Sequence, residues 1–416
     1  MKILTFLAAS LRIAVTGSRR YHAWLLALLC ISVIGIYYYL YQLRYGLIVT
    51  GMRDQVVWGS YIANFTFLVG VAAAAVMIVI PAYLYGFKDF KPVTLLGEML
   101  ASAALIMCII YVMVDMGRPD RVWHLLPFIG WPNFPRSLLT WDVLVLTGYL
   151  FINMFIPGYM LYSRYHHREP NKKILLPFTY LSIPWAVSIH TVTAFIYCGM
   201  VSRPIWNTAL MAPRFLATAF AAGPALIIII VQIVRRYTPY GSPGDKFEIP
   251  DATLFRIANI VLVAMLISLF FTACEIFTVF YSASAHEAPL QYLYFGLEGK
   301  HVLRPYIWLA LMAMVIATVI LLVPRTRKNL ITLNVACMLL FAGIWTEKGM
   351  GLILPAFIPS PLGEVFEYWP SNPEVVISIA VWAFGALIFT MLAKIAIQIE
   401  VGGVTHPTDD HRVPRG

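Results

Sequence analysis

Residues 93–115 read VTLLGEMLASAALIMCIIYVMVD, an almost continuous apolar run with one glutamate near its start and an aspartate at its end. A helix needs about 20 mostly apolar residues to cross the roughly 30 Å hydrocarbon core of a bilayer. Similar runs recur along the chain, separated by short polar joins rich in proline and glycine. The sequence therefore predicts ten membrane spans, over residues 23–42, 57–85, 93–115, 138–162, 174–199, 209–234, 254–281, 303–323, 330–358 and 374–398.

The composition agrees with this prediction. Of the 416 residues, 60% are hydrophobic and 12% are charged, whereas soluble domains average about 45–50% apolar and about 25% charged residues. A soluble enzyme is therefore excluded. The strands of a membrane β-barrel would show alternating segments of about 10 residues, which are absent here. We expect an all-α integral membrane protein of the cell membrane, surrounded by lipids.

The basic residues indicate how the chain is oriented. The formal net charge is +10, which in a soluble chain would suggest nucleic acid, but these bases lie in short loops between spans. The terminal arms and the loops after the even-numbered spans hold 20 Lys and Arg, and the opposite loops hold nine. Because basic loops stay in the cytoplasm, both termini are predicted to be cytoplasmic, with no nucleic acid partner. The opposite side is called the P side.

The amino-terminal segment 1–22 is apolar with scattered cations. Ser18-Arg19-Arg20 could belong to a twin-arginine export signal. No small-residue cleavage site precedes the first span, so we interpret the segment as a cytoplasmic amphipathic arm that lies at the membrane interface.

Ionisable residues inside the predicted spans gather toward the P side. An ionisable group in a span costs at least about 2.5–3.5 kcal/mol on insertion scales, so each one is a functional hypothesis. The group comprises Asp115, Asp142, His190, Arg214 and Glu275. The alternative is structural, because polar side chains also join helices through hydrogen bonds, and Arg214 could simply neutralise Asp142 or Glu275.

Helical spacing adds uncharged polar residues to this group. At 100° per residue, Asp142, Tyr149 and Asn153 point in a common direction and form a polar stripe. Tyr61 and Asn64 lie three residues apart near the P end of the second span. We expect these side chains to line the same site.

Two further acidic residues lie apart from this group. Glu98 is near the cytoplasmic end of the third span, and Glu347 lies within the ninth, next to Lys348. A proton path across the membrane needs acidic groups at several depths. Glu98, Asp115 and Glu347 are therefore the residues predicted to form such a path. The alternative for Glu98 is an interfacial side chain that reaches the lipid headgroups.

These residue types suit quinone chemistry. A quinone needs an apolar slot, hydrogen-bond donors for its two carbonyls, and groups that exchange protons. Donors are available from His190, Tyr61, Asn64 and Tyr149. Asp142 and Glu275 could relay protons, and Arg214 could hold an acid ionised or bias the local potential. The predicted catalytic residues are His190, Asp142 and Glu275, and the predicted quinone-binding residues are Tyr61, Asn64, Tyr149, His190 and Arg214.

No resident metal or redox centre is expected in this chain. The five cysteines are isolated within apolar runs, so no iron–sulfur or zinc spacing exists. A haem with two histidine ligands needs facing histidines, but His190 is the only histidine deep in a predicted span. Electrons would then reach the quinone from a docked redox subunit.

Two other functions remain open from the residues alone. A secondary transporter or ion-conducting protein would have a midplane site built from broken helices, and Pro184, Pro213 and Pro224 permit this. The position of the polar group near one face argues against it. A purely structural anchor for partner proteins gives no reason for so many buried ionisable groups.

Three stretches resemble a known family. Residues 58–70, WGSYIANFTFLVG, are similar to the first core helix of the NrfD/PsrC family of quinone-interacting membrane subunits. Residues 182–195, SIPWAVSIHTVTAF, and 213–224, PRFLATAFAAGP, resemble the DsrP branch of that family, from the DsrMKJOP complex of dissimilatory sulfur metabolism. The related membrane subunits of Hmc, Qrc and alternative complex III are close competitors. The resemblance covers roughly residues 44–398.

This resemblance implies a fold and a set of partners. Two four-helix bundles are expected, with the domains 1–22 (arm), 23–56 (first helix and P-side loop), 57–199 (first bundle), 200–358 (second bundle), 359–400 (last helix) and 401–416 (polar tail). It implies menaquinone as the substrate near the P side, at positions matching Tyr61, Asn64 and His190. It also implies a periplasmic ferredoxin-like iron–sulfur subunit, a multihaem or trihaem cytochrome c, a cytochrome b-type membrane subunit and a cytoplasmic iron–sulfur subunit.

Overall fold

The computed structural model describes residues 2–73, 75–84, 86–126, 129–240, 247–282 and 287–404. Within these ranges every regular element is a helix, apart from one isolated β-bridge between Leu297 and Lys300. Ten helical segments are long and apolar enough to cross a membrane. The prediction of an all-α protein with ten spans is therefore confirmed, and the chain is a multi-pass membrane protein.

The spans begin and end within a few residues of the predicted limits. In chain order they are α2 (Arg19–Tyr45), α3 (Ser60–Ala73) continued by α4 (Val76–Val79) and the π-helix η2 (Ile80–Leu84), α5 (Lys91–Asp115), α6 (Leu138–Tyr165), α7 (Lys172–Cys198), α8 (Met211–Tyr237), α9 (Asp251–Ser282), α11 (Arg304–Leu322), α13 (Leu330–Trp345) continued by the π-helix η5 (Thr346–Met350), α14 (Gly351–Ile353) and η6 (Pro355–Phe357), and α15 (Asn372–Glu400). Shorter helices are α1 (Lys2–Val15), η1 (Leu47–Val49), η3 (Lys88–Phe90), η4 (Pro119–Leu125), α10 (Ala288–Tyr294) and α12 (Pro324–Arg327).

Polar side chains fix where several spans begin. The hydroxyl of Ser137 accepts from the backbone N–H of Thr140 at the start of α6, and the Asn171 amide oxygen accepts from Lys173 at the start of α7. Ser18 caps α2 in the same way, so the Ser18-Arg19-Arg20 triplet forms the beginning of the first span. Such caps satisfy backbone donors that have no partner within the helix.

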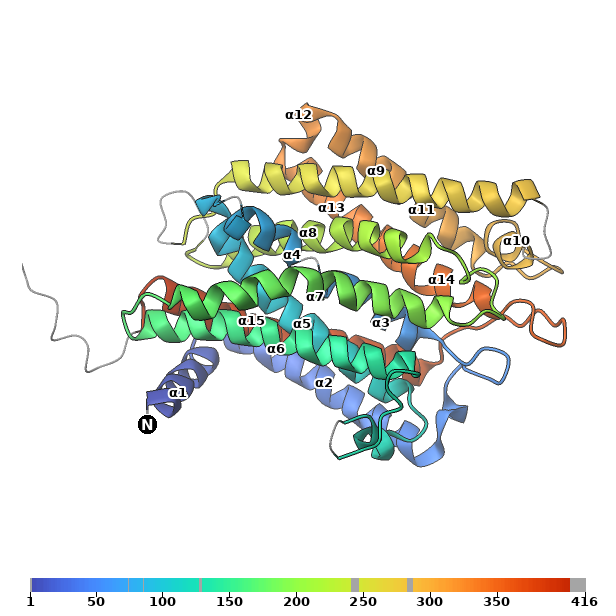
Figure 1. The fold of residues 1–416 in the computed structure, drawn as a ribbon, viewed down its shortest axis with the longest axis horizontal. Coiled ribbons are helices and arrows are strands. Elements are labelled where there is room, and N and C mark those ends of the chain that lie inside the picture. Colours follow the sequence, from blue (N-terminus) through green and yellow to red (C-terminus); the bar gives the residue numbers. More distant parts are fainter. Residues whose placement is uncertain are drawn as a thin grey trace, which may run out of the picture.

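The long helices run side by side along one direction (Figure 1). Helices α3, α5, α6 and α7 pack in a closed ring, each against the next, and α8, α9, α11 and α13 form a second ring. The rings meet where α8 packs on α3 and α7, and where η5 packs on α3. Helices α2 and α15 pack against each other, and α15 also packs on α5. The residue limits of the predicted domains stay an interpretation.

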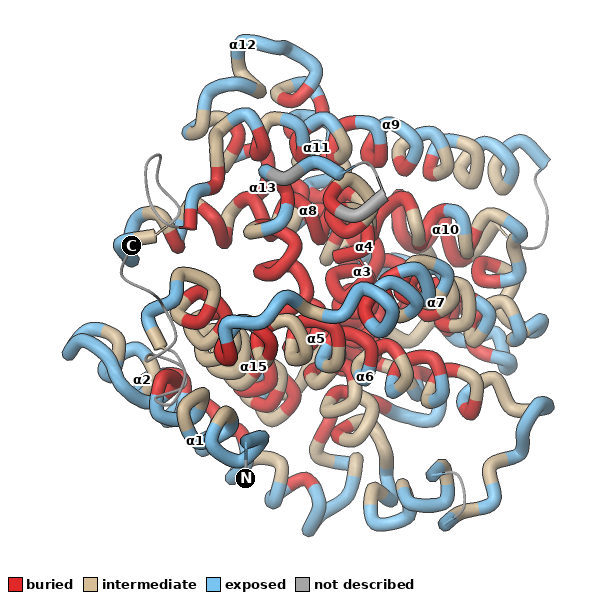
Figure 2. Tube along the Cα trace, turned by 60° about the vertical axis from the view of Figure 1, so that its left-hand side comes forward, coloured by how far each residue is buried: buried red, intermediate tan, exposed pale blue. Residues whose placement is uncertain are grey.

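Burial places the centre of the molecule on α3 and α5. All fourteen residues of α3 are buried, and Figure 2 shows buried residues concentrated in α3, α4 and α5, whereas α1 and α2 are largely exposed. The exposed surface of the outer helices is apolar, with side chains such as Leu26, Phe270 and Val319 at least half exposed. Helices that expose apolar side chains in this way fit a lipid surround.

The end of the molecule that carries η1, η4, α10 and residues 358–371 is called the P face below. It lies at the opposite end from α1 (Figure 1). The orientation of this face toward the periplasm is the prediction from the basic loops. The polar tail beyond residue 404 lies outside the described residues.

Two spans are interrupted, and they are not those with the central prolines. Helices α7 and α8 continue through Pro184 and Pro224, so the broken helices that a transporter would need there are not formed. The second span changes to a π-helix at Ile80, and the ninth does so at Thr346. Because π-helical turns are frequent at functional sites, the second interruption, which carries Glu347 and Lys348, is of particular interest.

Candidate functional site

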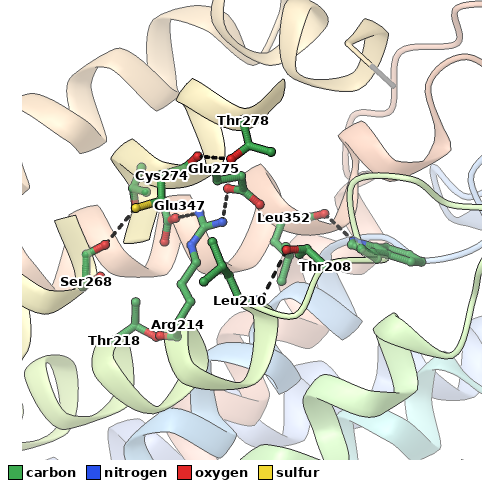
Figure 3. Close-up of polar contacts among 12 residues, drawn as sticks. Thr208, Leu210, Arg214, Thr218, Ser268, Cys274, Glu275, Thr278, Glu347 and Leu352 are labelled. Carbon is green, nitrogen blue, oxygen red and sulfur yellow. Dashed lines mark hydrogen bonds and ion pairs between the residues drawn. The ribbon is translucent and has the colours of Figure 1, made fainter. Parts of the chain in front are cut away.

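A buried ion cluster joins three helices of the second ring. The guanidinium of Arg214, on α8, forms ion pairs with Glu275 on α9 and with Glu347 on η5. Figure 3 shows the guanidinium between the two carboxylates. The side chains of Arg214 and Glu275 are each 11% exposed and that of Glu347 is 4% exposed. The sequence left open whether Arg214 neutralises Asp142 or Glu275, and the structure selects Glu275 and adds Glu347.

Lys348 brings a second cation to this cluster. Its ammonium donates a hydrogen bond to the backbone carbonyl of Phe215 at 3.2 Å. The same ammonium lies 4.3 Å from the centre of the Phe215 aromatic ring. A Cβ atom at Gly70 would lie 3.3 Å from Lys348 Nζ, so the glycine leaves room for the ammonium. Lys348 lines a cavity of about 10 Å³ together with Glu347, Arg214 and Thr218. That volume is about what one water molecule needs.

His190 belongs to the first ring. It is fully buried on α7, and neither ring nitrogen makes a hydrogen bond of good geometry within the described part of the chain. Buried polar groups almost always have a partner, so an unpaired imidazole at this depth indicates a place where another polar group binds.

Thr193 lies one turn after His190 on α7, and it pairs with Asp142 on α6. The Thr193 hydroxyl donates to the Asp142 carboxylate at 2.8 Å, and both residues are buried. Another turn on, the hydroxyl of Tyr197 makes a short hydrogen bond with that of Thr66 on α3. The face of α7 that carries Thr193 and Tyr197 therefore points into the first ring.

Tyr61 and Asn64 share the P end of α3 but do not point to one site. The Tyr61 hydroxyl donates to the side-chain oxygen of Gln42 on α2 at 2.8 Å. The Asn64 side-chain oxygen accepts from the indole N–H groups of Trp345 and Trp382 at 3.0 and 2.9 Å. In the structure the two residues lie in separate hydrogen-bond networks, each apart from the Asp142–Thr193 pair.

Tyr149 and Glu98 lie between α5 and α6. Both are buried, at 1% and 5% exposure, and their side chains interact electrostatically. The Ser102 hydroxyl donates to the carbonyls of Glu98 and Asn153 at 3.0 and 3.2 Å and connects the same two helices. Glu98 therefore lies inside the protein, and the alternative of a side chain at the lipid headgroups is wrong.

Asp115 belongs to a polar network that the sequence did not reveal. One of its carboxylate oxygens is buried without a hydrogen-bond partner in the described residues, and Asp115 interacts electrostatically with Glu374. The Glu374 carboxylate accepts from the Tyr368 hydroxyl at 2.5 Å and from the backbone of Gly51 and Ser371 at 2.5 and 2.9 Å.

Tyr368 fastens the loop before α15 to the start of α3. Its hydroxyl oxygen accepts from the backbone N–H of Ser60 at 2.9 Å while its proton goes to Glu374. Burial, with the nearby Glu374 carboxylate, raises the pKa of Tyr368 well above its ordinary value. The capping pattern Ser371-x-x-Glu374 was readable from the sequence, but its partner Tyr368 was not.

An apolar cavity of about 190 Å³ opens near the P face between α10, α11 and η5. Its walls include the side chains of Tyr306, Trp345, Thr346 and Trp369. Trp345 connects the cavity to Asn64 through its indole N–H, and Thr346 directly precedes Glu347. An apolar ring or an isoprenoid segment fits such walls.

The described residues contain no group of three or more His, Cys, Asp or Glu side chains that could hold a metal ion. The buried polar groups instead include the cluster around Arg214, the pair Asp142–Thr193, the network around Glu374, and the smaller groups around Tyr61, Asn64 and Glu98. Ten spans with these buried charged groups define a multi-pass membrane protein.

Comparison with known proteins identifies its family. Residues 48–356 match the model of the family described as polysulphide reductase, NrfD, so the chain belongs to the NrfD family. It is similar to an Hdr-like menaquinol oxidoreductase integral membrane subunit of Archaeoglobus fulgidus, with 24% identity over 85% of this chain and 82% of the relative. It is also similar to a subunit of the selenate reductase of Mesobacillus selenatarsenatis, with 20% identity over 92% and 96% of the two chains.

A further relative is the membrane subunit of a putative dimethyl sulfoxide reductase of Halobacterium salinarum, 28% identical. The match covers 54% of each chain, so this chain spans about half the length of that relative.

Proposed function

We propose that this chain is the membrane subunit of a respiratory redox complex that oxidises or reduces menaquinone near the P face. Membership of the NrfD family supports this proposal. So does the similarity to a subunit named for menaquinol oxidation and to subunits of selenate and dimethyl sulfoxide reductases. The P face is taken to lie toward the periplasm because the basic loops lie at the other end.

The observation that carries the proposal is the unpaired imidazole of His190. A quinone carbonyl needs a hydrogen-bond donor, and a quinol hydroxyl needs an acceptor. Neutral imidazole offers both, and here neither nitrogen makes a hydrogen bond of good geometry within the described residues, although the ring also interacts with the backbone of Ala186. Thr193 lies one turn from His190 on α7. Its hydroxyl bonds the Asp142 carboxylate on α6, and this pair offers a route for the proton. The apolar cavity beside Trp345, whose walls do not include His190, offers space for an isoprenoid tail.

Electrons need a partner in this proposal. Oxidation of a quinol releases two protons and two electrons, and the chain is expected to hold no haem or iron–sulfur cluster. The electrons would pass to a docked periplasmic ferredoxin-like iron–sulfur subunit. The resemblance of residues 182–195 and 213–224 to DsrP supports a complex of dissimilatory sulfur metabolism, with a multihaem or trihaem cytochrome c, a cytochrome b-type subunit and a cytoplasmic iron–sulfur subunit.

Proton translocation is the second part of the proposal. Glu98 is buried between α5 and α6, Asp115 lies near the P face and Glu347 belongs to the ion cluster of the second ring. Acids buried at different depths support a route for protons through the protein. Uptake or release at the P face would decide whether the redox step conserves energy.

The test is the substitution His190→Ala in the complete purified complex. We expect quinol-linked electron transfer to fall at least tenfold while the complex assembles, because a general acid–base group contributes 10²–10⁴-fold to rates. The matched control is Thr191→Ala, whose hydroxyl bonds only the carbonyl of Val187 in its own helix. Equal turnover in both variants would remove His190 from the site. A map of the complex with a menaquinone analogue should show planar density beside His190, whereas an open polar channel through the rings would favour the transporter.

A further inference from the structure

The apolar cavity near the P face has two rims that come from distant parts of the chain. Leu303 and Tyr306 form one rim, at the start of α11, and Trp369 and Pro370 form the other, in the segment before α15. The inner wall includes Trp345 of α13. The Tyr306 and Trp369 rings lie 6.0 Å apart between centroids, at 41° to each other. These two aromatic side chains therefore stand on opposite rims of the cavity.

One carboxylate ties the two rims together. Glu367 lies two residues before Trp369, and its Oε1 accepts from the backbone N–H of Val302 at 2.7 Å and from the Tyr292 hydroxyl of α10 at 3.3 Å. Val302 directly precedes the rim at α11. Tyr368, the residue between Glu367 and Trp369, is anchored to the start of α3. The separation of the rims is therefore fixed by hydrogen bonds on both sides of the cavity.

The polar groups of the inner wall are already in use. The Trp345 N–H donates to Asn64, and the Thr346 hydroxyl donates to the carbonyl of Ala342 in its own helix at 3.0 Å. The apolar side chains of the wall include Leu293, Leu303, Ile307 and Met350. Burying a polar group without a hydrogen bond is costly, so these walls favour a hydrocarbon chain over a ring that carries carbonyl groups.

The size of the cavity leads to the same conclusion. Its volume is about 190 Å³, and an apolar cavity of about 150 Å³ in another protein is enough for one benzene molecule. An isoprene unit is about the size of benzene and fits, whereas the fused rings of a naphthoquinone do not. Tyr306 is 46% exposed and Leu309, further along α11, is 59% exposed. The cavity is therefore continuous with an apolar surface that faces lipid.

We propose that this cavity binds part of the isoprenoid tail of the quinone, which enters between Tyr306 and Trp369 from the membrane leaflet at the P face. The flat aromatic side chains of the walls suit the planar double bond of an isoprene unit. Glu367 is a positioning residue, because it holds the Trp369 rim against the α11 rim. This inference rests on the proposed quinone reaction near the P face and adds to it a separate site for the tail.

The experiment measures KM and kcat of the complete complex with two electron donors: menadiol, which has no tail, and a menaquinol with several isoprene units. The variant Thr346→Phe places a ring in the cavity and removes only a hydrogen bond within its own helix. Because each buried methylene group contributes about fourfold to an affinity, we expect the KM for the tailed menaquinol to rise at least fourfold. The KM for menadiol and the kcat with both donors should stay unchanged.

The variant Glu367→Ala tests the positioning role. Loss of the hydrogen bonds between the rims should raise the KM for the tailed menaquinol alone, and by less than Thr346→Phe does, since the cavity stays open. The matched control is Glu364→Ala in the same segment, where the side chain is exposed. It should leave both KM values unchanged, and an equal effect of the two alanine variants would remove Glu367 from this role.

Each outcome decides for or against the site. An unchanged KM for the tailed menaquinol in Thr346→Phe overturns the inference, and so does an equal rise for both donors, because the cavity would then act on the quinone head. Loss of a co-purifying phospholipid with both KM values unchanged would make an acyl chain the occupant and overturn it as well. If the wild type turns over neither donor, the proposed function is refuted and this inference with it. If Thr346→Phe does not assemble, Trp369→Ala, at a position that is 57% exposed, takes its place with the same expected selective rise.

Discussion

Arg214 offers a direct test of the buried electrostatics. The substitution Arg214→Met removes the cation from between Glu275 and Glu347 while keeping an apolar side chain of similar length. Arg214 and Glu275 are each 11% exposed and Glu347 is 4% exposed, so solvent screens their charges little. Removing one partner of a buried ion pair costs about 3–5 kcal/mol, because it leaves uncompensated charge behind. We expect a loss of stability of about this size.

The structure also supplies the assay. Cys108 and Cys337 are fully buried, so a thiol-reactive dye labels them only when the fold opens on heating. Cys30 is exposed and Cys198 and Cys274 are partly exposed, so these three are replaced by serine in every variant compared. Arg164→Met is the control, since its ion pair with Glu400 at 3.2 Å joins side chains that are 45% and 30% exposed. Such pairs contribute about 0.2–1 kcal/mol.

A triple variant separates charge from packing. Arg214→Met with Glu275→Gln and Glu347→Gln has no unbalanced carboxylate beside the methionine, and we expect it to regain most of the lost stability. The reasoning is refuted if Arg214→Met melts at the same temperature as Arg164→Met. It is also refuted if the triple variant is no more stable than Arg214→Met, because the loss would then come from packing alone.

Two further predictions concern the other polar regions. Glu98→Gln keeps the shape of the side chain but removes its proton exchange, so it should lower membrane-potential formation at least twofold more than electron transfer; equal losses of both would argue against a dedicated path. Tyr368→Phe removes the hydrogen bond to Glu374 and should cost about 1.5–3 kcal/mol in the thiol-labelling assay, with the exposed Tyr281→Phe unchanged. Because the pKa of Tyr368 is raised in the folded protein, its contribution should be complete below about pH 10 and decline above it; a decline that begins near neutral pH would contradict this.

The polar residues show what spacing along one helix can predict about shared sites and what it cannot. Residues 193 and 197 lie one turn apart on one face of α7, where Thr193 contacts Asp142 and Tyr197 contacts Thr66. The same reasoning placed Tyr61 and Asn64 together, but their partners are on different helices. Spacing fixes the direction of a side chain relative to its own helix axis, not which helix lies opposite. On α3, which is buried on every side, a small angular difference selects a different neighbour.

The ion cluster shows the same limit. Arg214, Glu275 and Glu347 were each recognisable as charged residues within apolar runs, because such residues are costly in a membrane. Glu347 was expected apart from the P-side group, yet the packing of η5 against α3 and α13 brings it to Arg214. The π-helical turn that positions it has no simple sequence signature. Glu374 and its partner Tyr368 were missed for a related reason, since they lie far apart in the chain from Gly51 and Ser60.

The sequence by itself determined the number, limits and helical nature of the spans. Bilayer thickness sets a minimum apolar length, and unpaired backbone groups are not tolerated in lipid, so a one-dimensional pattern is sufficient. It also determined which residues carry unusual chemistry. Only the tertiary structure decided which of them meet, including the pairing of Arg214 with two acids and the position of Lys348 between the rings. Those contacts depend on the relative rotation and order of packed helices, which arise from the fit of many side chains at once.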